Sequence, residues 1–140
     1  MRTNLLIIAL FFAASLQGQT ETLEKRTKSY FDNSYISDGQ VYRVMLNPEE
    51  EGEFEVTFFS GTMYRVAMSA TIPPENVTYS ITDSDKNIIF TNEDFDNSPY
   101  WNFVFTSTFD CKIVVNIDKE EQQSGIVIMM IGYKNPPEAK

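Results

Sequence analysis

Few of the side chains that perform catalysis or hold metals occur in this 140-residue chain. It contains no histidine and one cysteine, Cys111. The absence of histidine excludes Ser–His–Asp and Cys–His nucleophiles, histidine-bound zinc and imidazole acid–base catalysis. The phosphate-binding patterns GxGxxG and GxxxxGK(S/T) are also missing. We therefore predict that the protein is not an enzyme.

Carboxylates are the abundant reactive groups. The chain has 20 Asp and Glu against 11 Lys and Arg, a formal net charge of -9. A pair of carboxylates facing one cleft could act as the acid and base of a glycosidase. Most of them lie in turn segments, where water surrounds them, so this is the last of our hypotheses. The negative field repels nucleic acid and anionic lipid and favours cationic partners or divalent ions. We expect no nucleic-acid partner.

One polar loop has the spacing of the first half of a calcium-binding loop. Asp83, Asp85 and Asn87 form D-x-D-x-N, and calcium prefers such oxygen ligands. The rest of the segment differs from a calcium-binding loop, because Ile88 replaces the loop glycine and Asp94 stands where a glutamate would close the loop. The same residues suit a polar hairpin, since Asp and Asn adopt turn conformations readily. We expect no cofactor, with calcium at this loop as the alternative.

Two adjacent aromatic residues, Tyr100 and Trp101, follow an acidic loop at residues 92–99. Aromatic rings beside carboxylates and amides can bind ligands such as sugars. Trp101 is in phase with Phe103 and Phe105 and is expected in the core. Tyr100 then points to the opposite face and is the better candidate for a surface contact. These two residues are the candidate ligand-binding residues.

The elements that must position these residues are strands. From Gln40 onward apolar and polar residues alternate with period two, which is typical of half-buried strands. The alternating pattern predicts an all-β fold, an antiparallel β-sandwich of about eight strands with jelly-roll or Greek-key pairing. A closed barrel is the alternative. The predicted strands are residues 41–46, 53–58, 64–71, 77–82, 88–90, 101–106, 111–117 and 126–131.

Two of these strands carry further predictions. Residues 126–131 (IVIMMI) are apolar at every position, which predicts a strand that is covered on both faces or lies at the centre of its sheet. Cys111 is in phase with Ile113, Val115 and Ile117. We therefore expect its thiol to be buried, with an intermolecular disulfide as the alternative.

The N-terminal residues have the three-part pattern of a secretory signal peptide. Arg2 precedes an unbroken apolar run at residues 5–14, and small or polar residues follow up to Gly18. The run is shorter than the roughly 20 residues that span a bilayer. We expect cleavage after Gly18 or Gln19, a periplasmic or extracellular mature protein, and no membrane span in it. The expected divisions are residues 1–18, the signal peptide; 19–37, an N-terminal extension, either helix or first strand; 38–135, the β-sandwich; and 136–140, a C-terminal tail.

The segment from Glu53 to Lys134 resembles the β-sandwich domains of the pre-peptidase C-terminal type, which are appended to secreted bacterial peptidases. More distantly it resembles lumenal GOLD-type sandwiches. The resemblance implies a non-catalytic accessory or interaction sandwich. The stretches that carry it are FEVTFFSGTMYRVAM, VTYSITDSDKNIIF, WNFVFTSTFDCKIVVNI and SGIVIMMIGYK.

Three functional hypotheses follow from these observations. The first is an exported, non-catalytic β-sandwich module that binds a protein or glycan partner which the sequence does not identify. The second is a small carbohydrate- or calcium-dependent ligand-binding domain. The third is an acid–base glycosidase.

Overall fold

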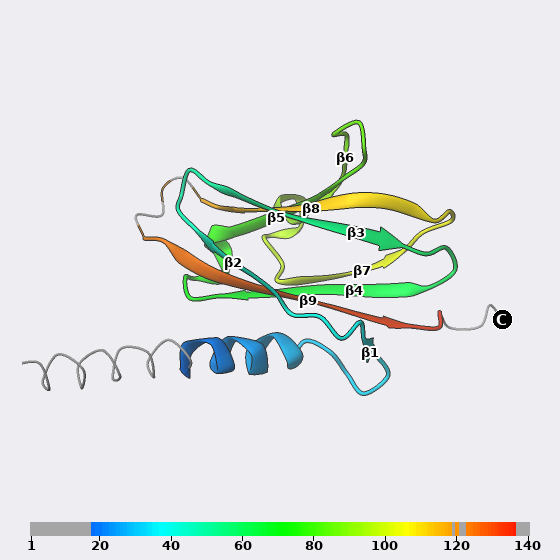
Figure 1. Ribbon diagram of the computed structural model, residues 1–140, viewed down its shortest axis with the longest axis horizontal. Coiled ribbons are helices and arrows are strands. Elements are labelled where there is room, and N and C mark those ends of the chain that lie inside the picture. Colours follow the sequence, from blue (N-terminus) through cyan, green and yellow to red (C-terminus); the bar gives the residue numbers. More distant parts are fainter. Residues whose placement is uncertain (1–17, 119, 121–122, 137–140) are drawn as a thin grey trace, which may run out of the picture.

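Two antiparallel β-sheets make up most of the structure, a computed structural model that describes residues 18–118, 120 and 123–136 (Figure 1). The all-β prediction is confirmed: each predicted strand is present, and a short additional strand, β1, precedes them. The predicted signal peptide is residues 1–18, and all of it except Gly18 lies outside the described residues. The strands are β1 (Ile36–Ser37), β2 (Tyr42–Leu46), β3 (Glu51–Phe58), β4 (Met63–Ala70), β5 (Val77–Thr82), β6 (Ile88–Thr91), β7 (Tyr100–Val104), β8 (Phe109–Ile117) and β9 (Gly125–Lys134), with 3₁₀ turns η1 (Pro74–Asn76) and η2 (Asn92–Phe95).

The two sheets are separate, so the fold is a sandwich rather than the closed barrel considered above. Sheet A has the order β1–β9–β4–β7, and β2 pairs with the same edge of β9 as β1 does. Sheet B has the order β3–β8–β5–β6. Strands that are distant in sequence are therefore neighbours: β3 pairs with β8 over its full length, from Glu51 opposite Asn116 to Phe58 opposite Phe109.

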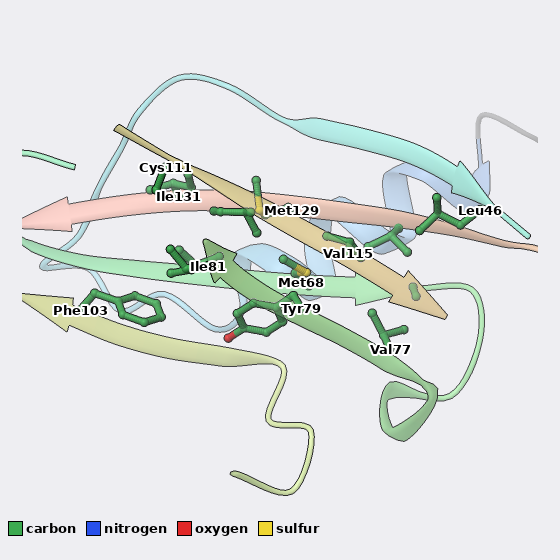
Figure 2. Close-up of a cluster of buried hydrophobic side chains, with 14 of the residues drawn as sticks. Leu46, Met68, Val77, Tyr79, Ile81, Phe103, Cys111, Val115, Met129 and Ile131 are labelled. Atoms are coloured by element: carbon green, nitrogen blue, oxygen red, sulfur yellow. The ribbon is translucent and has the colours of Figure 1, made fainter. Parts of the chain in front are cut away.

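The main core lies between the two sheets, where the alternating apolar residues meet. In β5 and β8 every second side chain is buried, as the period of two predicts. Phe58 is fully buried, and its ring lies 4.8 Å from that of Tyr64 and 5.0 Å from that of Phe105. Figure 2 shows side chains of both sheets, including Tyr79 and Phe103, meeting in this space. Burial of each large apolar side chain stabilises the fold by about 1.5–3 kcal/mol.

A helix covers the outer face of sheet A. Residues 18–28 are helical, and Figure 1 shows this helix lying along the side of sheet A that faces away from sheet B. Leu23 packs with Ile128 and Met130 in a second apolar cluster. Because Val127, Met129 and Ile131 face the main core while Ile128 and Met130 lie under the helix, the predicted covering of 126–131 on both faces is confirmed.

The segment 19–37 contains both of the forms considered for it, a helix up to residue 28 and then strand β1. The sandwich also begins slightly earlier than the predicted residue 38. Ile36 pairs with Tyr133 and Ser37 with Gly132. The period of two does not mark this two-residue strand, because both of its side chains are exposed and no alternation is present.

Candidate functional site

The outer face of sheet B differs from that of sheet A in having no helix over it in the described part of the chain (Figure 1). Most of its outward positions are polar, in alternation with the buried residues, and Val114 of β8 is an apolar exception. In β3 the outward residues Glu53, Glu55 and Thr57 are all exposed. Neighbouring β8 presents Lys112 and Asn116 on the same side, both partly exposed.

This face is hollowed into an open groove of about 740 Å³, which we call the sheet B groove. Strands β3, β5 and β8 supply its floor, and the hairpin between β5 and β6, which Figure 1 shows projecting from the sandwich, supplies one wall. Carboxylates outnumber ammonium groups along it, so the groove is negatively charged. Its charged residues are Glu51, Glu53, Glu55, Asp83 and Asp110, with Lys86 and Lys112.

Two polar contacts across the strands order part of this groove. Lys112 Nζ forms an ion pair of 3.1 Å with Glu53 Oε2, with both side chains about half exposed. Thr57 donates a hydrogen bond from its hydroxyl to the Asp110 carboxylate. Thr57 and Asp110 lie directly opposite each other on the paired strands β3 and β8, whereas Lys112 contacts Glu53 diagonally across them. The carboxylates of Glu51 and Glu55 take part in neither contact and are exposed, so solvent or a partner can satisfy them.

The predicted calcium loop forms the hairpin wall of the groove. Asp83 accepts hydrogen bonds from the backbone N–H of Asp85 (2.9 Å) and from the backbone N–H (2.8 Å) and side-chain amide (3.0 Å) of Asn87. The hydrogen bonds from Asn87 lower the pKa of the Asp83 carboxyl below its ordinary value. Over the described residues, no group of three or more His, Cys, Asp or Glu is placed to hold a metal ion. The geometry explains the D-x-D-x-N spacing as a turn, and calcium binding here stays an untested alternative.

Tyr100 and Trp101 lie on opposite faces of β7, so they do not form one binding platform. Trp101 is half-buried at the edge of the core, 4.2 Å from the ring of Phe95 and 5.7 Å from that of Phe90. This agrees with its expected place in the core. Tyr100 is on the outer face of sheet A, where its ring lies 5.4 Å from that of Tyr30.

Tyr100 belongs to a cluster that attaches the N-terminal segment to sheet A. The Arg65 guanidinium lies over the rings of Tyr35 (4.6 Å) and Tyr100 (4.7 Å). It also donates to the backbone carbonyl of Tyr30 (2.5 Å) and to Asn102 Oδ1 (2.7 Å). Since one face of the Tyr100 ring is occupied by Arg65, the structure gives Tyr100 an anchoring role within the chain.

Cys111 is buried, as predicted, with 5% of its surface exposed. Its thiol donates a weak hydrogen bond to the Val56 carbonyl at 3.4 Å. Burial, and to a lesser degree the negative charge of Asp110, raise the pKa of the thiol to about 11. A protonated, enclosed thiol is a poor nucleophile.

The sequence analysis did not predict the sheet B groove, although it predicted the strands that carry its residues. The alternation identifies Glu53 and Glu55 as outward-facing residues of one strand and Lys112 as an outward-facing residue of another. It does not say which strands are neighbours. Only the order β3–β8–β5 brings these side chains onto one surface.

Comparison with known proteins adds information on the fold. No protein-family model matches the chain, and no curated protein matches it in sequence. Among solved structures, it is similar to Aeromonas hydrophila PliG, a periplasmic lysozyme inhibitor of g-type lysozyme. The TM-score is 0.50 at 13% sequence identity, over 72% of this chain and 90% of that chain. At this identity the similarity concerns the fold, and it agrees with the β-sandwich. No helix within the described ranges is long and apolar enough to cross a membrane.

Proposed function

We propose that this protein is an exported, non-catalytic module that binds a protein partner through the sheet B groove. The observation that carries the proposal is the difference between the two outer faces. The outer face of sheet A is closed by the N-terminal helix, with Leu23 packed over Ile128 and Met130. The outer face of sheet B is open, hollowed and lined by charged side chains.

The shape and lining of the groove favour a macromolecule over an enclosed small ligand. Small-molecule sites are usually mostly apolar clefts that bury the greater part of the ligand. The floor of this groove instead mixes charged and polar side chains of β3, β5 and β8 with apolar ones such as Val114, and it is open to solvent. Such a surface suits side chains that a partner protein inserts from above.

The charge of the groove indicates a basic partner. Five carboxylates and two ammonium groups line it, and the chain as a whole carries a formal charge of -9. A field of this sign attracts a positively charged protein and accelerates its association. The carboxylates of Glu51 and Glu55 have no protein hydrogen-bond or ion-pair partner among the described contacts, and they would accept hydrogen bonds from lysine or arginine side chains.

The absence of a catalytic role rests on the residues of the chain. The sequence has no histidine, and its one thiol is buried. The similar structure, PliG, is an inhibitor, so a sandwich of this kind can act on another protein without catalysis of its own. The resemblance to pre-peptidase C-terminal-type sandwiches implies the same kind of role. Export is supported by the signal-peptide pattern of residues 1–18.

Charge reversal in the groove tests the proposal. We would measure binding of the mature protein to a panel of positively charged proteins that includes a g-type lysozyme. For a partner that binds, Glu51→Lys/Glu55→Lys should weaken affinity by at least about tenfold, since misplaced interface charges cost several kcal/mol. Higher salt should weaken binding to the wild-type protein.

The control variant is Glu21→Lys/Glu75→Lys. It changes the net charge by the same amount at exposed positions on the N-terminal helix and in η1, outside the groove. Its affinity should stay close to that of the wild type. Equal losses in the two variants would show that only the overall charge matters, and a panel without any binding partner would contradict a basic partner.

A further inference from the structure

One apolar side chain in the wall of the sheet B groove lies outside the core. Ile88 belongs to the hairpin between β5 and β6 and is one of the residues that line the groove. It is 65% exposed, the highest value among the large hydrophobic side chains of the described residues. Single exposed apolar residues are common and need no function. The placement of Ile88 must therefore decide whether it has one.

A β-bulge places Ile88 on the outer face of sheet B. Ile81 of β5 pairs with Phe90 of β6. The next residue, Thr82, pairs with Ile88, so Ile89 is an extra residue in β6. Without the bulge, Ile88 would point to the same face as Phe90, which packs against the main core. Because Thr82 lines the groove, Ile88 opposite it faces the groove too, and bulges are known to redirect side chains in this way.

The bulge also brings Ile88 into one cross-strand row with an exposed glutamate. Ile88 lies opposite Thr82, and Thr82 lies opposite Lys112 of β8. Lys112 in turn lies opposite Glu55 of β3. Three strand spacings separate Ile88 from Glu55 along this row, about 14 Å in all. The row therefore crosses the groove from an apolar side chain on the hairpin to a carboxylate on the edge strand.

Hydrogen bonds within the hairpin turn order the segment that carries Ile88. The Asp83 N–H donates to the Asn87 carbonyl at 3.0 Å, and the Lys86 N–H donates to the Asp83 carbonyl at 3.1 Å. The Asp83 carboxylate accepts the further hydrogen bonds described above. A contact residue on an ordered segment loses less conformational entropy on binding. The hairpin thus presents Ile88 at the groove before a partner arrives.

We propose that Ile88 is the apolar anchor of the partner interface, an inference that rests on the proposed function of the groove. The partner is a basic protein that packs an apolar side chain against Ile88 and places a lysine or arginine at Glu55, about 14 Å away. A second copy of this chain does not fit, because its formal charge of -9 would oppose an acidic groove. At many interfaces a few desolvated contacts carry most of the binding free energy, while charges set the association rate. The carboxylates would then attract basic proteins in general, and Ile88 would select among them.

Ile88→Ser tests this assignment on a panel protein that binds the wild-type mature protein. The substitution should weaken affinity at least about tenfold, mainly through faster dissociation, which surface plasmon resonance measures. The loss should persist at high salt, because salt screens charges and not apolar contacts. Tm should stay close to that of the wild type, since the side chain is mostly exposed. Ile88→Leu keeps the apolar volume and should retain most of the affinity.

The matched control is Ile89→Ser. It makes the same change at the next residue, which is 51% exposed and is not among the residues that line the groove. Its affinity should stay close to that of the wild type. Equal losses in Ile88→Ser and Ile89→Ser would overturn the inference, because the groove-facing side chain would then have no special role.

The outcomes also separate this inference from the proposed function. Binding that Glu51→Lys/Glu55→Lys weakens and Ile88→Ser leaves unchanged would overturn the role of Ile88 alone. The acidic groove would then still be the interface. If no basic protein in the panel binds the wild type, the proposed function fails and the role of Ile88 fails with it.

Discussion

At the scale of single residues, Cys111 shows how the sandwich suppresses the one reactive thiol of the chain. The side chain lies inside the main core, next to the β3 backbone. Its pKa is raised to about 11 from an ordinary value of 9.0. Near neutral pH this difference alone reduces the thiolate fraction about 100-fold. Enclosure then restricts the access of reagents.

We therefore expect native protein to react with Ellman's reagent at pH 8 at least about 100-fold more slowly than unfolded protein. The measurement compares the same sample with and without denaturant. The denatured sample is its own control, because it should react rapidly and with one thiol per chain. Rapid stoichiometric labelling of the native protein would show that the thiol is exposed and would reopen the intermolecular disulfide alternative.

At the scale of elements, the N-terminal segment depends on close contact with β9. After the predicted cleavage the helix would run from residue 19 or 20 to residue 28, and an isolated helix of that length is marginal in water, so it would require the sheet beneath it. Leu23 supplies one apolar contact, and the partly buried Phe31 packs against the same cluster. The hydrogen bond from Arg65 to the Tyr30 carbonyl attaches the segment that follows the helix to sheet A.

Gly132 makes this contact possible because it has no side chain. A Cβ at this position would lie 2.8 and 2.9 Å from ring carbons of Phe31 and 3.3 Å from Cβ of Tyr35. Gly132→Ala should therefore displace Phe31 and lower the free energy of unfolding by about 1–3 kcal/mol. Amide hydrogen exchange should become faster in residues 18–37 than elsewhere.

The matched experiment places the same change in a Phe31→Ala background. With the ring removed, Gly132→Ala should cost much less, so the two changes should be non-additive. Equal costs in both backgrounds would show that Gly132 acts through something other than the Phe31 contact.

At the scale of the whole molecule, stability should be lost as pH rises through the alkaline range. The chain has no histidine, the side chain that ordinarily titrates near neutrality. Burial, followed by the charge of Asp38 and a hydrogen bond to it, raises the pKa of Tyr42 to about 12. Burial also raises the pKa of Tyr79, and that of Cys111 rises from 9.0 to about 11. In each case the folded state holds its proton more tightly than the unfolded state.

The free energy of unfolding should therefore be nearly constant between about pH 6 and pH 8. It should fall as pH rises from about 9 to about 12, where the unfolded chain loses protons that the folded chain retains. Urea unfolding across this range measures the effect. Tyr42→Phe removes one of these groups and should reduce the alkaline slope. A marked slope near pH 7 would contradict this account.

Several features of the protein follow from the sequence alone. The period of two identified each strand except β1, and it assigned Cys111 to the core. The turn residues Asp83 and Asn87 marked the hairpin that they form. These features depend on local backbone geometry, since successive side chains of a strand point to opposite faces wherever the strand is placed. The missing histidine is likewise readable without a structure, whereas export stays a prediction from residues 1–18.

The tertiary structure alone decided which surfaces exist. The acidic groove requires β3 beside β8. The tertiary structure likewise shows that a helix covers Ile128 and Met130. The apolar pattern of β9 predicts that both of its faces are buried, but it does not indicate which element covers them. Strand order depends on how all the buried faces pack together, which is a non-local contribution to the free energy. The alternation of apolar residues within one segment therefore does not predict it.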